Sequence, residues 1–196
     1  MPQIGLQPLD PLTGANFTLG NEGGPVVLRV RTDDVTISGP SKMQLQKVIY
    51  NEKQSRFEIT AYHKLLKMTG NFYANGHILV VPVRSRGFFT FEFKDVQALH
   101  TLKMRKNIQE KLQDKTATFK VNNLSRVIVN LKDQNNAPSY GLNRLVNDNW
   151  KLVSQAMIPS MERSIQKIYS AALSPIFNSF TVNEILPQTL RNTLDT

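Results

Sequence analysis

Histidine has the broadest chemical use of the residue types in this sequence, because imidazole acts as a general acid or base near neutral pH and binds metals. The chain carries His63, His77 and His100. No two of them share a helix at metal-ligand spacing, and no cluster of carboxylates accompanies them. We therefore interpret them as ordinary strand or surface histidines, and we predict no metal site.

Other patterns that could support catalysis lack the partners that their chemistry requires. Asp33 and Asp34 are adjacent, so in a strand they point to opposite faces and do not form an acid–base pair. Ser164 and Lys167 match Ser-x-x-Lys, but they lie in a helical pattern without the companion motifs. The glycine-rich segment 20–24 lacks the Lys-Ser/Thr of a phosphate-binding loop, and the chain has no cysteine. The sequence predicts a protein that is not an enzyme and uses no cofactor.

Composition and charge narrow the class of protein further. The chain has 196 residues, of which 40% are hydrophobic and 20% charged, and we expect one globular domain over residues 1–196. Its formal net charge is +9, with no run of five basic residues. No zinc-finger, helix-turn-helix or RNP-like pattern occurs, so we predict no nucleic-acid partner. Two interpretations stay open: a basic surface that is merely solvated, or one that docks on anionic membranes or proteins without a bound lipid.

Alternation of apolar and polar residues dominates from residue 26 to residue 132. Two clear examples are Val26, Leu28 and Val30, and Phe89, Phe91 and Phe93. A period of two residues, broken by frequent turns, predicts a large antiparallel sheet. Residues 78–83 have the pattern of a strand that is apolar on both faces. Residues 1–25 are rich in proline and glycine and are predicted to form an irregular lead-in.

The period changes to three or four residues between positions 146 and 180, which predicts one long helix of about 50 Å. We expect Pro159 to kink this helix and Pro175 to bend or end it. In the second half of the helix the apolar arc is wide, which indicates that other structure embraces it. The predicted fold class is therefore α+β, with a sheet followed by a long C-terminal helix.

The apolar residues exceed what one face of a sheet needs. They either form a packed core or leave space for an apolar ligand between a curved sheet and the helix. The residues that we predict to line such a site are Phe89, Phe91, Phe93, Trp150, Val153, Met157, Met161 and Ile165. The choice of strand face depends on register, because a shift of one residue exchanges the two faces.

Several short segments follow the order and spacing of the insect takeout and juvenile-hormone-binding proteins, which the sequence resembles from about Gly5 to Pro187. The segments are Pro8-Leu9-Asp10-Pro11-Leu12, Asp34-Val35, Gly39-Pro40-Ser41-Lys42, Asn51-Glu52, a series of Gly70, Tyr73, Gly76, Ile78, Leu79, Pro82 and Gly87, the run from Asn143 to Trp150, Pro159, and Glu184-Ile185-Leu186-Pro187. Each match is weak alone, but their order makes the resemblance specific.

The resemblance implies a strongly curved antiparallel sheet wrapped around one long helix, with a hydrophobic tunnel between them. It implies a secreted, monomeric insect carrier of a small lipophilic ligand: juvenile hormone, a fatty-acid-like molecule or an isoprenoid. Transient contact with a membrane or receptor, and a role in circadian or feeding regulation, belong to the same expectation.

The sequence departs from the family at its beginning. Members usually carry a signal peptide and then a segment with two cysteines that form a disulfide, and this sequence has neither. We therefore expect a member whose sequence starts some tens of residues late. Two glycosylation sequons, Asn16-Phe17-Thr18 and Asn123-Leu124-Ser125, are consistent with secretion.

Overall fold

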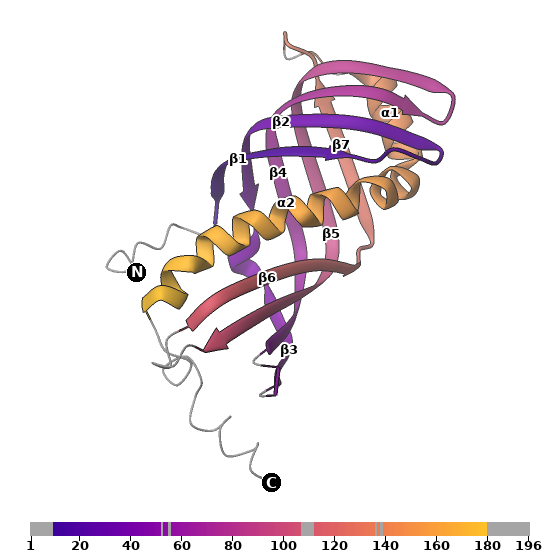
Figure 1. Ribbon diagram of the computed structural model, residues 1–196. Helices are drawn as coiled ribbons and strands as arrows, with labels where there is room; N and C mark the ends of the chain where they lie inside the picture. The colour runs from indigo at the N-terminus through magenta and orange to yellow at the C-terminus, as the bar shows by residue number, and fades with distance from the viewer. Residues whose placement is uncertain are drawn as a thin grey trace.

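The computed structural model describes residues 10–51, 53–54, 56–106, 112–135, 137 and 139–179. Within these ranges the chain forms one antiparallel sheet followed by two helices (Figure 1). The strands are β1 (Leu12–Gly20), β2 (Val26–Ser38), β3 (Gln44–Asn51), β4 (Arg56–Ile78), β5 (Val81–Lys106), β6 (Leu112–Asn123) and β7 (Arg126–Lys132). A short 3-10 turn at Pro40–Lys42 connects β2 to β3, and the helices are α1 (Tyr140–Asp148) and α2 (Trp150–Ser179).

The β4–β5 hairpin forms the centre of the sheet. Each of its two strands is long enough to pair with different neighbours along its length. Near the hairpin turn, β4 pairs with β2, and β5 pairs with β7. Farther from the turn, β4 pairs with β3, and β5 pairs with β6. Strand β1 extends the sheet beyond β2. The sheet in Figure 1 therefore has an upper half ordered β1-β2-β4-β5-β7 and a lower half ordered β3-β4-β5-β6.

Strand β5 changes partners at Asp95, whose backbone is left-handed with φ 51°. It pairs with β7 as far as Lys94 and with β6 from Gln97 onward. The Asp95 carboxylate accepts hydrogen bonds from Ser125 Oγ, between β6 and β7, and from Tyr62 Oη on β4. The Ser125 bond, followed by that from Tyr62, holds the pKa of Asp95 below its ordinary value. These bonds tie together the place where the two halves of the sheet meet.

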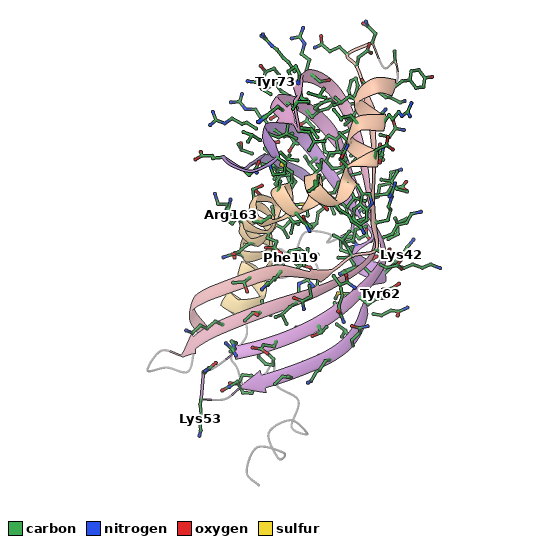
Figure 2. The ribbon with its side chains drawn as sticks, turned by 90° about the vertical axis from the view of Figure 1, so that its right-hand side faces the viewer. Lys42, Lys53, Tyr62, Tyr73, Phe119 and Arg163 are labelled. Atoms are coloured by element: carbon green, nitrogen blue, oxygen red, sulfur yellow. The ribbon has the colours of Figure 1, made fainter. Side chains whose placement is uncertain are left out.

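The concave face of the sheet is apolar and is covered by the helices. Helix α2 runs diagonally across this face in Figure 1, and α1 packs against β7. Figure 2 shows the side chains gathered between the helices and the upper half of the sheet, with Phe119 lying beside α2. The core is built from alternate strand positions, as the period of two residues predicted, and Val35, Phe72 and Phe93 are among its buried members.

The predicted sheet and long helix are confirmed, but the sheet begins earlier than expected. The prediction of an irregular lead-in over 1–25 is wrong for residues 12–20, which form β1. Phe17 and Leu19 of this strand are buried against the core, while Pro11 and Gly20 stand at its ends. The prolines and glycines therefore mark the limits of a strand. Residues 1–9 lie outside the described residues.

The helical region is divided, whereas one helix over 146–180 was predicted. Helix α1 begins at Tyr140, and Asn149 separates it from α2 with φ −107° and ψ 23°. The Asn149 Nδ2 donates a hydrogen bond to the Leu145 carbonyl, which satisfies the last turn of α1. Helix α2 continues through Pro159 and Pro175 to Ser179, and residue 180 lies outside the described residues.

Residues 78–83 contain a hairpin turn, and the prediction of one strand apolar on both faces is wrong there. Ile78 pairs with Val81, so Leu79 and Val80 are the two residues of the turn. Ile78 is buried, whereas Val80 is 94% exposed. The apolar run was misleading because aliphatic residues occupy a turn that polar residues and glycine usually fill.

Candidate ligand pocket

An apolar pocket of about 110 Å³ lies between the upper half of the sheet and the two helices. Strands β1, β2, β4, β5 and β7 supply one side of its lining, and α1 and α2 supply the other. Ser154 is the one polar residue among the described residues that line it. The pocket therefore suits a molecule that is largely hydrocarbon, with room for few polar contacts.

Alternation along the strands explains why the lining is apolar. On β2, Leu28 and Val30 are buried and line the pocket, whereas Arg29 between them is exposed. On β4, Phe72 and Ala74 line it, and Tyr73 between them is 45% exposed. One set of side chains on each strand thus faces the pocket, while the other set forms the outer surface.

Six of the eight residues predicted from the sequence line this pocket. They are Phe91, Phe93, Trp150, Val153, Met157 and Met161. The two phenylalanines lie two positions apart on β5, which places them on one face of the strand. The other four recur on α2 at intervals of three or four residues, which places them on one face of the helix.

Phe89 lies outside the lining of this pocket, although it is 2% exposed. It pairs with Gly70 across β4 and β5, and a Cβ atom at Gly70 would lie 3.1 Å from Phe89 Cε1. The absence of a side chain at Gly70 therefore makes room for the ring. The rings of Phe89 and Phe91 have centroids 4.5 Å apart, so Phe89 supports a residue that does line the pocket.

Ile165 lines a second apolar cavity of about 40 Å³, farther along α2. Phe93 and Met161 line both cavities, so these two side chains stand between them. The second cavity reaches Phe119 and Val121 of β6, in the lower half of the sheet. Seven of the eight predicted residues thus line one or both of two apolar cavities, between which Phe93 and Met161 stand.

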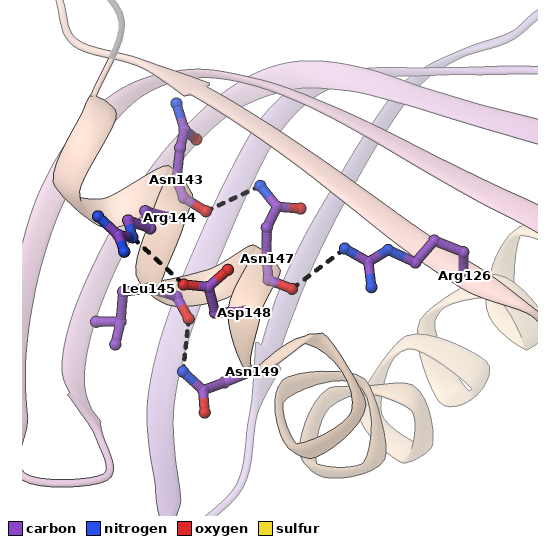
Figure 3. A network of polar contacts seen from close by, with 7 residues as sticks. All are labelled: Arg126, Asn143, Arg144, Leu145, Asn147, Asp148 and Asn149. Atoms are coloured by element: carbon purple, nitrogen blue, oxygen red, sulfur yellow. Dashed lines mark hydrogen bonds and ion pairs between the residues drawn. The ribbon is translucent and has the colours of Figure 1, made fainter.

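Helix α1 is held against the sheet by two asparagines, Asn143 and Asn147, whose places on the helix Figure 3 shows. Their amides bond to β7 as the backbone of a neighbouring strand would. Asn143 Oδ1 accepts a hydrogen bond from Leu131 N at 2.6 Å, and its Nδ2 donates to Leu131 O at 2.9 Å. Asn147 makes the same pair with Val129 N at 2.9 Å and Val129 O at 2.7 Å. Both amides thereby satisfy the free edge of β7, and they place Leu142 and Val146 in the pocket wall.

These asparagines belong to the run from Asn143 to Trp150 noted in the sequence, but their role was not predicted. The available signal was their spacing of four residues, which puts both amides on one face of a helix. Figure 3 also shows Arg126 donating to the Asn147 carbonyl, at 3.4 Å. The Arg126 guanidinium lies 5.4 Å from the centre of the Trp150 ring, which lines the pocket.

Asp10 links two other sequence segments noted above. Its carboxylate accepts hydrogen bonds from Gly39 N at 3.0 Å and from Ser41 N at 3.1 Å, and also from Ser41 Oγ. The Ser41 hydroxyl is the main cause that holds the pKa of Asp10 below its ordinary value. This contact joins the start of β1 to the turn between β2 and β3.

Two of the three histidines are buried in the lower half of the sheet, away from the larger pocket. His63 and His100 are 3% and 5% exposed, and their ring centroids lie 6.4 Å apart. Burial lowers the pKa of both, to about 4 for His100. The interpretation of His63 and His100 as strand residues is correct, and neither lies at the surface. No group of acidic or histidine side chains in the described part of the chain is arranged to hold a metal ion.

A strongly curved antiparallel sheet that encloses an apolar pocket against a long helix is the architecture of a tubular lipid-binding fold. The sequence matches the family model of haemolymph juvenile hormone binding protein over residues 1–187, and the chain belongs to this family. The resemblance inferred from the sequence is thereby confirmed.

A solved structure has the same fold. The crystal structure of Takeout 1 from Epiphyas postvittana aligns with a TM-score of 0.74 at 21% sequence identity, covering 94% of this chain and 86% of that one. A lipopolysaccharide binding protein aligns with a TM-score of 0.40 at 11% identity, covering 88% of this chain and 35% of that one. A comparison with curated protein sequences found no significant match. None of the described helices has the length and apolar character needed to cross a membrane.

Proposed function

We propose that this protein is a non-catalytic carrier that holds a small lipophilic molecule between its sheet and helices. The observation that carries the proposal is the apolar pocket, whose described lining has Ser154 as its one polar residue. Membership of the juvenile hormone binding family supports the same class of ligand. We expect Phe91, Trp150 and Met157 to contact the ligand directly, with Phe89 acting through Phe91.

Burial of apolar surface supplies the affinity for such a ligand. Each Å² removed from water contributes about 25 cal/mol, so a ligand that hides roughly 300 Å² gains several kcal/mol before its loss of motional freedom is counted. Ser154 offers one acceptor at the pocket, because its hydroxyl donates to the Lys151 carbonyl at 3.0 Å and leaves the oxygen to accept a hydrogen bond from a ligand. Juvenile hormone, fatty acids and isoprenoids are all largely hydrocarbon, as this apolar lining requires.

The length of the ligand depends on the partition between the two cavities. A cavity of about 110 Å³ is smaller than a long-chain lipid requires, and the adjoining cavity adds about 40 Å³. We infer that a long ligand turns the Phe93 and Met161 side chains aside and occupies both cavities. Methionine is suited to this movement, because its unbranched side chain adopts many rotamers at low cost.

We also propose that the carrier is secreted and monomeric. The two sequon asparagines fit secretion, because Asn16 lies on β1 and Asn123 at the end of β6, and both are exposed. A glycan at either position would extend into solvent. Enzymatic deglycosylation of protein secreted from insect cells, read by its change in mass, tests this placement.

Native mass spectrometry of the secreted protein, with an organic extract of the same sample, tests the carrier proposal. The expected result is a discrete added mass that extracts as a lipid. Trp150, the one tryptophan of the chain, gives a second readout, because a ligand entering the pocket should change its fluorescence. A clean apo mass, with no fluorescence response to lipophilic compounds, would instead favour a basic module that docks on anionic partners without a bound lipid.

A Met157→Trp variant tests the assignment of the site within this proposal. The larger ring should fill the pocket and weaken binding, because Met157 lines it from α2. Circular dichroism checks that the fold is retained. Unchanged affinity in a folded variant would remove Met157 from the site.

A further inference from the structure

The turn of the β4–β5 hairpin presents aliphatic side chains to solvent. Val80 is 94% exposed, and its neighbours Leu79 and Val81 are 43% and 41% exposed. Leu79 has φ 54°, a left-handed backbone that favours glycine or asparagine over leucine. Exposed aliphatic residues at such a position indicate a surface that meets an apolar environment.

Four arginines stand behind this turn, in two adjacent rows across the sheet. In the row nearer the turn, Asn75 of β4 pairs with Arg29 of β2 and Arg84 of β5. In the next row, Tyr73 of β4 pairs with Arg31 of β2 and Arg86 of β5. All four arginine side chains are exposed on the convex face: Arg29, Arg31, Arg84 and Arg86. In Figure 2, Tyr73 lies toward the upper end of the molecule, opposite the end that carries Lys53.

Among the described residues, no carboxylate neutralises these arginines. Within the described part of the chain none of the four forms an ion pair. Glu22, in the turn between β1 and β2, lines a groove together with Arg29 but does not pair with it. Asp33, the next carboxylate along β2, pairs with Asn71 in a row farther from the turn. At the upper end of the sheet, the exposed aliphatic turn thus lies next to four arginines that form no ion pair with a described residue.

The same strands carry the pocket on their inner face. Ile78 and Val83, which flank the turn, line the pocket, and so do Leu28 and Ala74 beneath the arginine rows. A hydrogen bond from Leu79 N to Pro25 O connects the β4–β5 turn to the neighbouring β1–β2 turn. The pocket therefore ends directly under the exposed turn.

We propose that the β4–β5 turn and the two arginine rows behind it form a docking surface for anionic lipid membranes. The aliphatic tip enters the boundary between headgroups and acyl chains, while the guanidinium groups bind lipid phosphates and carboxylates. A polyanion without an apolar phase would use the arginines but would gain nothing from the tip. Docking brings the pocket to the bilayer, so that a lipophilic ligand can exchange without crossing water. The proposal of docking depends only on this surface, whereas the proposed role in ligand exchange rests on the proposed carrier function.

Vesicle sedimentation with the full chain tests the docking. We expect binding to vesicles of phosphatidylcholine with phosphatidylserine at low salt, and at least about tenfold weaker binding to phosphatidylcholine alone or at high salt. Val80→Asp should reduce binding about tenfold, and so should the double variant Arg84→Gln and Arg86→Gln.

Matched controls lie elsewhere on the same molecule. Val48 of β3 is 45% exposed, and Lys64 and Lys67 of β4 are exposed basic residues. Val48→Asp, and the pair Lys64→Gln and Lys67→Gln, should change vesicle binding by less than about twofold. Equal losses in the control variants would overturn the proposal. Heparin binding that needs the arginines, combined with vesicle binding that ignores Val80→Asp, would overturn it in favour of a polyanion partner.

The absence of cysteine allows a second measurement that does not depend on charge changes. An environment-sensitive fluorophore attached to Val80→Cys should shift to the blue with anionic vesicles, whereas the same label at Val48→Cys should not. Equal responses at both positions would contradict insertion of the tip.

Transfer of a fluorescent fatty acid from the protein to acceptor vesicles separates docking from the carrier function. The rate should rise with acceptor concentration and phosphatidylserine content, and Val80→Asp should slow transfer without changing the equilibrium affinity for the probe. Failure of the probe to bind would count against the carrier function and leave the vesicle results intact. Transfer at a rate independent of acceptor vesicles would overturn the exchange role alone.

Discussion

Ser160 and Glu162 are two positions apart on α2, yet they hydrogen-bond to strands at opposite edges of the sheet. Ser160 Oγ accepts a hydrogen bond from Gly20 N of β1 at 3.1 Å. Glu162 Oε1 accepts one from Val121 N of β6 at 2.6 Å. Strands β1 and β6 end the strand order of the sheet, so among the described residues no further strand pairs with their outer backbone groups. One turn of α2 thus fastens the first and the last strand of this order to the helix.

Replacement of Glu162 should therefore destabilise the protein more than its partial exposure suggests. Glu162→Leu leaves the Val121 N–H without an acceptor, and we expect a loss of about 1–3 kcal/mol in the free energy of unfolding. Glu162→Gln keeps a carbonyl oxygen and should recover most of it. Urea unfolding followed by circular dichroism measures both variants, and equal stability of the two would show that the bond to Val121 contributes little.

The buried histidines predict a loss of stability in mildly acidic solution. Burial lowers the pKa of His100 from 6.5 to about 4, so between these values the unfolded chain binds more protons than the folded one. The free energy of unfolding should be highest above pH 6.5 and fall as the pH drops toward 4, by up to about 3 kcal/mol from His100. His63, whose pKa burial also lowers, adds to the fall.

His100→Phe separates this effect from the loss of carboxylate contacts. The ring of His100 packs against both Phe119 and Tyr169, with its centroid 5.2 Å from each, so phenylalanine fits this aromatic site. The free energy of unfolding of this variant should depend less on pH between 6.5 and about 4 than that of the wild type. Asp10 and Asp95, whose pKa values are lowered, lose their contribution only as the pH falls below their ordinary value of 3.8. An unchanged slope above pH 4 in His100→Phe would contradict the assignment to His100.

The edge of β7 gives a third prediction. Asn147→Leu removes the two hydrogen bonds that its amide makes with Val129, and we expect it to cost roughly 2 kcal/mol or more. The pocket should loosen as well, because Val146 beside it lines the wall. Arg144→Ala is the matched control on α1, since its contact with Asp148 at 3.5 Å is exposed and should be worth less than about 0.5 kcal/mol. Thermal unfolding of both variants tests the prediction: Asn147→Leu should lower the melting temperature clearly more than Arg144→Ala does.

Periodicity predicted most of the fold, because alternation and helical spacing are local properties of the chain. The series Phe89, Phe91 and Phe93 was assigned to one face of a strand, and the structure places all three inside. The turn at Leu79 and Val80 was missed because its residues contradict local preference, as often occurs where a surface has a separate purpose. The strand over residues 12–20 was missed because proline and glycine near its ends hid the alternation.

The contacts that depend on tertiary placement could not be predicted in the same way. Asn143 and Asn147 could be placed on one helix face, but nothing local showed that β7 would meet that face. The burial of His63 did have a local signal, because Phe57, Ile59 and Ala61 precede it at alternate positions on β4. Its neighbours in the sheet then removed both water and hydrogen-bond partners, and Nδ1 of His63 is buried without one.

The partition between the two cavities gives the prediction that bears most directly on ligand choice. Met161 is 7% exposed and lines both cavities, so Met161→Ala should join them. We expect a loss of about 2–5 kcal/mol in stability, as for other buried methionines. Affinity for a long-chain fatty acid such as palmitic acid should rise relative to that for decanoic acid, because the longer chain no longer has to displace the Met161 side chain. Quenching of Trp150 fluorescence measures both affinities.

Met157→Ala is the matched control, because Met157 lines the larger pocket but not the smaller one. This variant enlarges the larger pocket and leaves the partition in place, so the ratio of affinities for the two fatty acids should stay close to that of the wild type. The contrast between the two variants isolates the partition from cavity size, since both remove the same atoms from the same helix. If both variants change the ratio equally, total volume sets the preference for chain length, and Met161 does not divide the pocket for the ligand.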